Sequence, residues 1–156
     1  MKDLKSIPDI NMDKLSSFAP LPIRIMMGIA FIIHGLPKFA DIEGFQGYFA
    51  SAGIPPELAL PLALLEVIGG IALIVGIATR IASILFMVEM IGAIIMVKAS
   101  TGFAVGGGYE LDLLLMSIAI SLLISGPGRI SIEKDVLKRE MFPKIRHNQK
   151  KKLAIG

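Results

Sequence analysis

Two carboxylates, Glu66 and Glu89, lie inside a nearly unbroken apolar stretch over residues 58–97. The stretch is too long for one membrane-spanning helix of about 20 residues, and Thr79-Arg80 interrupts it, so it predicts two antiparallel spans joined by a tight turn. At 1.5 Å per residue, Glu66 lies roughly 20 Å and Glu89 roughly 15 Å from that turn, so both are expected near mid-membrane depth. Two neighbouring carboxylates cannot both ionise cheaply in a low dielectric. The pair is therefore a candidate proton relay, or a candidate hydrogen-bonding site for a polar ligand such as a quinone headgroup.

A second set of ionisable side chains follows one face of the first apolar segment. On a helical wheel with 100° per residue, Arg24, His34 and Lys38 fall within an arc of about 80°. These residues, together with Arg80 in the turn, are candidates for the cation that would neutralise a carboxylate. His34 is in addition a candidate for proton transfer or for orienting a ligand carbonyl.

Further acidic side chains stand at the start of the last apolar segment, where Glu110 and Asp112 follow Tyr109. Their place predicts a polar pocket that opens to the outside of the membrane, with the two buried glutamates at its floor. The candidate catalytic residues of this pocket are Glu66 and His34. The residues expected to bind a cofactor there are Arg24, Lys38, Glu89, Glu110 and Asp112.

Each of these residues also has a structural interpretation. The two glutamates can hydrogen-bond across a packed helix interface, at roughly 0.6 kcal/mol per contact. Arg24, Lys38 and Arg80 can extend to the lipid headgroups and fix the topology, and His34 can be an interfacial residue. No metal site is predicted, because the candidate ligands lack tight spacing. Three small residues of the hairpin are expected to allow close helix packing: Gly69, Gly70 and Gly76.

The composition indicates an integral membrane protein. The chain is 54% hydrophobic and only 19% charged, and its mean hydropathy is +0.72, whereas soluble domains are about 45–50% apolar and roughly 25% charged. It contains no Cys, which excludes disulfides, thiolate catalysis and iron–sulfur clusters ligated by this chain. Any redox cofactor of these kinds would have to belong to a partner.

Four apolar segments, at about residues 21–37, 57–78, 80–98 and 109–125, predict an all-α fold, an antiparallel bundle of four transmembrane helices within a membrane domain over 21–128. Residues 1–20 are expected to form a cytoplasmic leader, and residues 129–156 a basic cytoplasmic tail. The connection after the first span is expected to contain a short interfacial helix around Phe45–Ser51. The fourth segment has about 14 clean apolar residues, a length that would also suit a re-entrant or core helix.

The distribution of positive charge favours four spans over three. With four spans, every Lys and Arg except Lys38 and Lys98 collects on the side that holds both termini and the Arg80 turn. The positive-inside rule then places both termini in the cytoplasm, with the chain as a multi-pass protein of the plasma membrane. The basic tail could also bind anionic lipid, although a solvated topology anchor is the favoured explanation.

Three stretches of the chain carry motifs that are typical of one family. They are RIMMGIAFIIHGLPKF, GFQGYFASAGIPPELALPLALLEVIGGIALIVGIATR and GGGYELDLLLMSIAISLLISGPGRISIE. The motifs include His34-Gly35, the Gly53-Ile54-Pro55 turn, the Glu66 to Arg80 pattern, and the ending that runs from Tyr109 to Arg129. Taken together, from Arg24 to Glu133, the chain resembles the DoxX family of small four-helix membrane proteins. Glu89 lies outside the motifs that carry this resemblance.

The resemblance implies a four-helix membrane bundle and leaves several activities open. Related proteins include subunits of a quinone-linked thiosulfate oxidoreductase or quinol oxidase assembly, members of oxidative-stress defence complexes, and a eukaryotic cargo receptor. The expected function is therefore a non-haem membrane subunit of a quinone-linked oxidoreductase or oxidative-stress complex, with a quinone as the candidate cofactor. The alternatives are a proton-coupled carrier or binding subunit for a small or lipidic molecule, and a structural scaffold. The expected partners are membrane lipids, redox subunits and further copies of the chain, but not nucleic acid.

Overall fold

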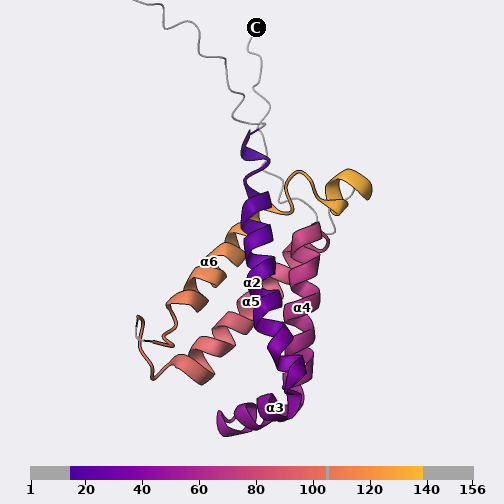
Figure 1. Cartoon of the computed structure of the whole chain (residues 1–156). Coiled ribbons are helices and arrows are strands. Elements are labelled where there is room, and N and C mark those ends of the chain that lie inside the picture. The colour runs from indigo at the N-terminus through magenta and orange to yellow at the C-terminus, as the bar shows by residue number, and fades with distance from the viewer. Residues whose placement is uncertain (1–14, 105, 139–156) are drawn as a thin grey trace, which may run out of the picture.

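The computed structural model describes residues 15–104 and 106–138, and in these ranges the chain is all-α (Figure 1). Apolar runs between Gly- and Pro-rich breaks produce long helices because a helix satisfies its own backbone hydrogen bonds. The α-helices are α2 (Pro20–Ala40), α3 (Ile42–Ser51), α4 (Ala59–Val75), α5 (Thr79–Gly92) and α6 (Glu110–Ser125). Shorter turns are the 3₁₀ helix η2 (Pro56–Leu58) and the π-helical turns η3 (Ala93–Lys98) and η4 (Ile132–Val136).

Three of these helical segments are long and apolar enough to cross a membrane: Pro20–Ala40, Pro56–Val75 and Thr79–Lys98. They coincide with the first three predicted apolar segments and are candidate membrane spans. The fourth predicted segment is also a helix, α6, but its 16 residues reach only about 24 Å at 1.5 Å per residue. That α6 crosses the membrane stays a prediction. The short helix expected around Phe45–Ser51 is present as α3, and it begins three residues earlier.

The helices form two pairs that separate toward one end of the molecule. α2 packs along α4, and α5 packs along α6, whereas α4 and α5 make far fewer contacts. Figure 1 shows the α5–α6 pair diverging from the α2–α4 pair toward the end that α3 crosses. We call this the α3 end, and the opposite one, where η4 (Ile132–Val136) lies, the η4 end.

Glycines bring α2 and α4 into backbone contact. A Cβ added at Gly28 would lie 2.5 Å from the carbonyl oxygen of Gly70, and one added at Gly70 would lie 2.7 Å from the carbonyl oxygen of Gly28. Either methyl group would collide with the neighbouring backbone. Gly70 is therefore a close-packing site, as predicted, and Gly28 is its partner.

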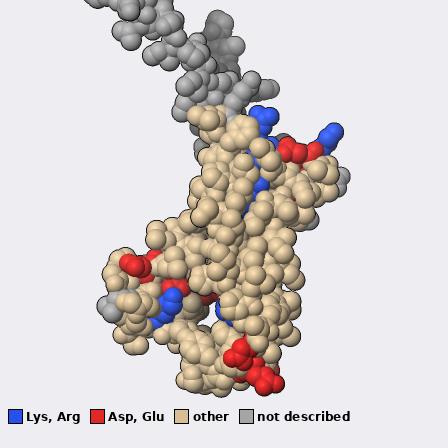
Figure 2. Space-filling view, in the orientation of Figure 1, with Lys and Arg blue, Asp and Glu red and all other residues tan. Residues whose placement is uncertain are grey.

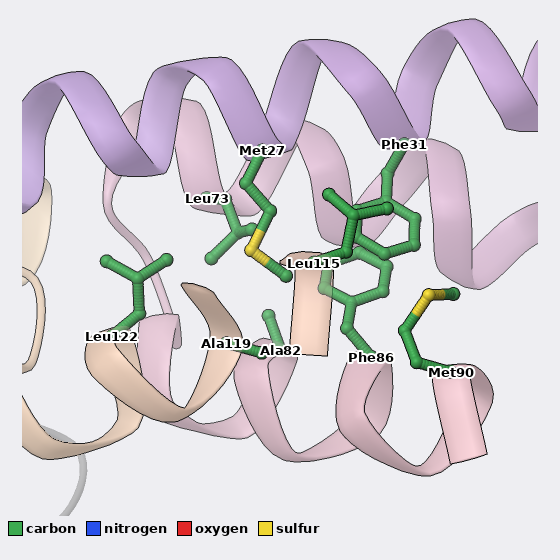
Figure 3. Close-up of a cluster of buried hydrophobic side chains, with 9 residues drawn as sticks. All are labelled: Met27, Phe31, Leu73, Ala82, Phe86, Met90, Leu115, Ala119 and Leu122. Carbon is green, nitrogen blue, oxygen red and sulfur yellow. The ribbon is translucent and has the colours of Figure 1, made fainter. Parts of the chain in front are cut away.

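One apolar core joins the two helix pairs (Figure 3). The rings of Phe31 from α2 and Phe86 from α5 stack with their centroids 3.6 Å apart. Removing such side chains from a polar phase supplies about 1.5–3 kcal/mol each in water. In lipid the contribution comes instead from close packing between helices. The cluster consists of Met27, Phe31, Leu73, Ala82, Phe86, Met90, Leu115, Ala119 and Leu122.

The η4 end is closed by the segment that follows α6. Arg24 is fully buried there, and its guanidinium donates to the carbonyl oxygens of Pro127 and, at 2.6 Å, of Ile130. Glu133 is also buried, and its Oε1 accepts the backbone N–H of Thr79 at 3.1 Å. We call this set of contacts the clasp. The predicted tail boundary at residue 129 therefore cuts through a packed segment, and Arg24 anchors that segment rather than extending to the headgroups.

The hairpin turn between α4 and α5 is as tight as predicted. Gly76 ends α4 in the left-handed conformation, with φ of +72°, and Ala78 precedes α5 with φ of +50°. A Cβ at Gly76 would lie 2.7 Å from a guanidinium nitrogen of Arg24. Gly76 is thus required both by its backbone conformation and by the approach of the clasp.

Candidate functional site

A cavity of about 380 Å³ lies where the two helix pairs diverge, at the α3 end. Side chains of α2, α3, α4, α5, η3 and α6 line it, and most of the lining is apolar, including Phe31, Leu62 and Met90. Figure 2 shows a hollow between the two arms of the molecule, with Lys or Arg and Asp or Glu side chains at its edge. Small-molecule sites in proteins have this character, an apolar body with a few polar groups.

The first polar group of the cavity is an ion pair between α2 and α4. The Nζ atom of Lys38 lies 2.5 Å from Oε1 of Glu66, and the two side chains are 19% and 4% exposed. Because its Nζ pairs with Glu66, the Lys38 side chain points into the cavity. It does not extend to the lipid headgroups, contrary to one interpretation of the sequence. Of the candidate cations predicted from the sequence, Lys38 is the one that pairs with Glu66.

The second polar group is Glu89 on α5, whose carboxyl group lies within hydrogen-bonding range of the Glu66 carboxyl. This contact brings together the two acids of the apolar hairpin, as their depths predicted. One oxygen on each side chain, Oε2, is buried and receives no hydrogen bond from the described residues. A buried oxygen without a donor is costly, so these two atoms are the places where a ligand or a proton would be most stabilising.

The third polar group is an ion pair between Lys98 and Asp112, with Nζ and Oδ2 2.6 Å apart. Lys98 ends the π-helical turn Ala93–Lys98, and Asp112 is buried in the first turn of α6. Asp112 was predicted to lie in the pocket, but the role of Lys98 was missed. Its sequence signal was only a lysine at the end of an apolar run, which is also where topology-fixing lysines occur.

Aromatic side chains of α3 cover the α3 end of the cavity. Phe45, Tyr48 and Phe49 all line it, and Nζ of Lys38 lies 4.8 Å from the centroid of the Phe45 ring. Asp41 fixes the start of α3 by accepting the N–H of Gly44 at 2.9 Å. The aromatic spacing in the predicted interfacial helix was the available signal for this cover, but these residues were not proposed as part of the site.

Five of the seven predicted site residues line the cavity: His34, Lys38, Glu66, Glu89 and Asp112. His34 also lines a second, shallower groove on the outer surface between α2 and α3, so it lies between the cavity and the exterior. The other two do not reach the cavity. Glu110 is exposed, and Arg24 is held in the clasp at the η4 end.

The ligand types that the cavity could hold follow from its donors and acceptors. Lysine ammonium groups donate, and the two unpaired carboxyl oxygens accept, so both carbonyl and hydroxyl groups of a ligand could be bound. Within residues 15–104 and 106–138, no group of three or more His, Asp and Glu side chains is placed to hold a metal ion.

Comparison with known proteins points to one family. The DoxX family profile matches residues 19–99. The chain is 39% identical to the protein named "Putative oxidoreductase CatD" of Bacillus subtilis, over 81% of this chain and 93% of the relative. It is 35% identical to the inner membrane protein YphA of Escherichia coli, over 71% of this chain and 85% of the relative. It is 30% identical to the uncharacterized membrane protein Rv3486 of Mycobacterium tuberculosis, over 75% of this chain and 80% of the relative. No solved structure matches the chain at a significant level.

Proposed function

The chain belongs to the DoxX family, and we propose that its cavity binds the headgroup of a quinone. In this proposal the protein is a non-haem membrane subunit of a quinone-linked oxidoreductase or oxidative-stress complex. The oxidoreductase name of the Bacillus relative supports that context. Because the chain has no Cys, thiolate-bound redox centres belong to a partner subunit, and this chain supplies the pocket.

The observation that carries the proposal is the placement of donors and acceptors at one wall of an apolar cavity. Lys38 can donate to a quinone carbonyl, and the unpaired Oε2 atoms of Glu66 and Glu89 can accept from the hydroxyl groups of a quinol. His34, at the opening, is positioned to orient a headgroup carbonyl. The remaining lining is apolar and suits a ring and the start of a lipid tail.

The proposed setting is the plasma membrane, as the name of the Escherichia coli relative, inner membrane protein YphA, supports. We place the α3 end outside and both termini in the cytoplasm, because that orientation keeps the basic residues inside. The quinone then reaches the cavity from the outer half of the bilayer. Redox partner subunits are part of the same proposal, since the chain has no Cys to hold a thiolate-bound redox centre. Self-association is proposed with them.

A proton-coupled carrier for a small or lipidic molecule is the second candidate, and the three carboxyl groups that face the cavity favour it. A carrier must also open at its other end. There the clasp joins α2 to the loop after α6 through Arg24, and α5 to η4 through Glu133. Among the described residues these contacts close the η4 end, which fits a binding subunit better. Uptake into proteoliposomes that disappears in Glu66→Gln would reverse this preference.

The test of quinone binding is thermal protection of the purified protein in lipid nanodiscs. With decylubiquinone at 100 times its dissociation constant, binding stabilises the folded state by about 2.7 kcal/mol. We expect this protection in the wild type and a loss of most of it in Lys38→Met. Glu110→Gln is the matched control, because Glu110 is an exposed acid that does not line the cavity. Equal protection of all three proteins, or none in the wild type, would contradict the proposal.

A further inference from the structure

The charges that face the cavity do not balance. The described residues of its lining include two cations, Lys38 from α2 and Lys98 from η3, and three acids, one each from α4, α5 and α6. Each lysine already forms an ion pair, with Glu66 and with Asp112. Glu89 is the acid without a lysine of its own. An isolated carboxylate at this depth would cost at least about 2.5–3.5 kcal/mol.

The geometry around Glu89 offers a way to remove this charge. Its carboxyl group lies within hydrogen-bonding range of the Glu66 carboxyl, and neither ionised carboxylate can donate a hydrogen bond to the other. The contact becomes a hydrogen bond only if a proton lies between them. Glu66 is itself 3% exposed, and its Oε2 atom has no other donor among the described residues.

We propose that Glu66 and Glu89 share one proton in the ligand-free protein, and that the pair is a proton-binding site that opens to the exterior at the α3 end. The charges of the cavity then cancel, with two cations facing two net negative charges. The site does not depend on the identity of the ligand, because the proton is bound when the cavity is empty.

The route of exchange follows from the same side chains. Lys38 contacts Glu66, and His34 stands one helical turn before Lys38 on the same face of α2. His34 lines both the cavity and the groove on the outer surface. At the other end the apolar core around Phe31 and Phe86 separates the acids from the clasp. The proton therefore exchanges past His34 and not through the η4 end.

Infrared spectroscopy of the quinone-free protein in lipid tests the shared proton directly. At neutral pH the wild type should show the C=O stretching band of a protonated carboxylic acid, and the band should shift in D₂O. Glu89→Gln should lose this band, since Glu66 then remains ionised beside Lys38. Glu110→Gln is the matched control and should keep it, because Glu110 is an exposed acid that does not line the cavity.

The conservative variant Glu89→Asp separates a loss of the proton from a loss of the fold. It keeps an acid at the position and should retain the band at a shifted frequency. Absence of the band in the wild type, or its persistence in Glu89→Gln, would overturn the proposal. Neither result depends on quinone binding, which is measured separately by thermal protection.

The exchange route is tested by the rate at which the band shifts after transfer to D₂O. His34→Phe should slow this shift at least tenfold, because it replaces the exchangeable imidazole at the opening. Ile33→Phe, at an exposed neighbouring position in α2 that lines only the outer groove, should leave the rate unchanged. An unchanged rate in His34→Phe would contradict the proposed exchange route. It would not bear on the shared proton, which the presence of the band in the wild type and its loss in Glu89→Gln test separately.

Discussion

At the scale of single residues, the site depends on which charges are paired. Lys38 and Glu66 come from helices that contact each other through Gly28 and Gly70, so the backbones approach closely enough for the side chains to meet. A buried ion pair contributes little net stability relative to apolar side chains, but the loss of one partner leaves an uncompensated charge. Function rather than stability is therefore the better explanation of the pair.

Replacing Glu66 by Gln should destabilise the protein because Lys38 loses its carboxylate partner. The expected cost is about 2–3 kcal/mol, somewhat below that of a fully buried pair since Lys38 is partly exposed. Unfolding of the protein in mixed detergent micelles measures it. The double variant Lys38→Met/Glu66→Leu should recover most of the loss, and if the double variant is no more stable than Glu66→Gln, the pair is not the cause.

At the scale of elements, the helix packing depends on small residues and on the ends of helices. The contact between α2 and α4 needs a glycine on both sides. The start of α5 has no side-chain cap of its own, since Ala78 precedes it. The acceptor is supplied from far along the chain by Glu133. Both features hold in place the helices that carry the acids of the cavity.

Gly28→Ala should separate α2 from α4 and destabilise the protein by about 1–3 kcal/mol, the usual cost of overpacking. The added methyl group meets the Gly70 carbonyl oxygen and the Ile74 side chain, and the backbone cannot yield cheaply. Gly92→Ala is the matched control, because a Cβ there meets no atom within 4 Å. A melting temperature of Gly28→Ala at or above that of Gly92→Ala would refute the close contact.

Glu133→Ala should destabilise the η4 end by about 0.5–2 kcal/mol, the range for loss of a helix cap. Glu133→Gln retains an oxygen that can accept the Thr79 N–H, so it should cost clearly less. Hydrogen exchange at the first turn of α5 reports the difference, with faster exchange expected in the alanine variant. Equal protection of this turn in both variants and in the wild type would show that Glu133 is not its cap.

At the scale of the whole molecule, the sequence predicted the helices better than the contacts between them. The length of the apolar runs determined the spans, and the depths of Glu66 and Glu89 brought the two acids together correctly. The Lys98–Asp112 pair could not be predicted because it depends on the π-helical turn over Ala93–Lys98. The burial of Arg24 depends on a chain reversal after α6, about 100 residues away, which periodicity does not reveal.

The orientation of the whole chain can be measured with single cysteines, because the natural sequence has none. Ser100→Cys lies in the loop before α6, and Lys134→Cys lies in η4, and both positions are exposed. In intact cells a membrane-impermeant maleimide should label Ser100→Cys, and should label Lys134→Cys only after permeabilisation. Labelling of both from outside would mean that α6 does not cross the membrane.

The central claim is that the cavity holds a quinone headgroup, and photolabelling with an azido-quinone in native membranes tests it most directly. We predict that the label attaches to residues that line the cavity, such as Met90 and Met96, that excess decylubiquinone prevents the labelling, and that Lys38→Met abolishes it. Labelling that decylubiquinone does not prevent, or that is confined to outward-facing residues such as Met26 and Ile124, would contradict the claim.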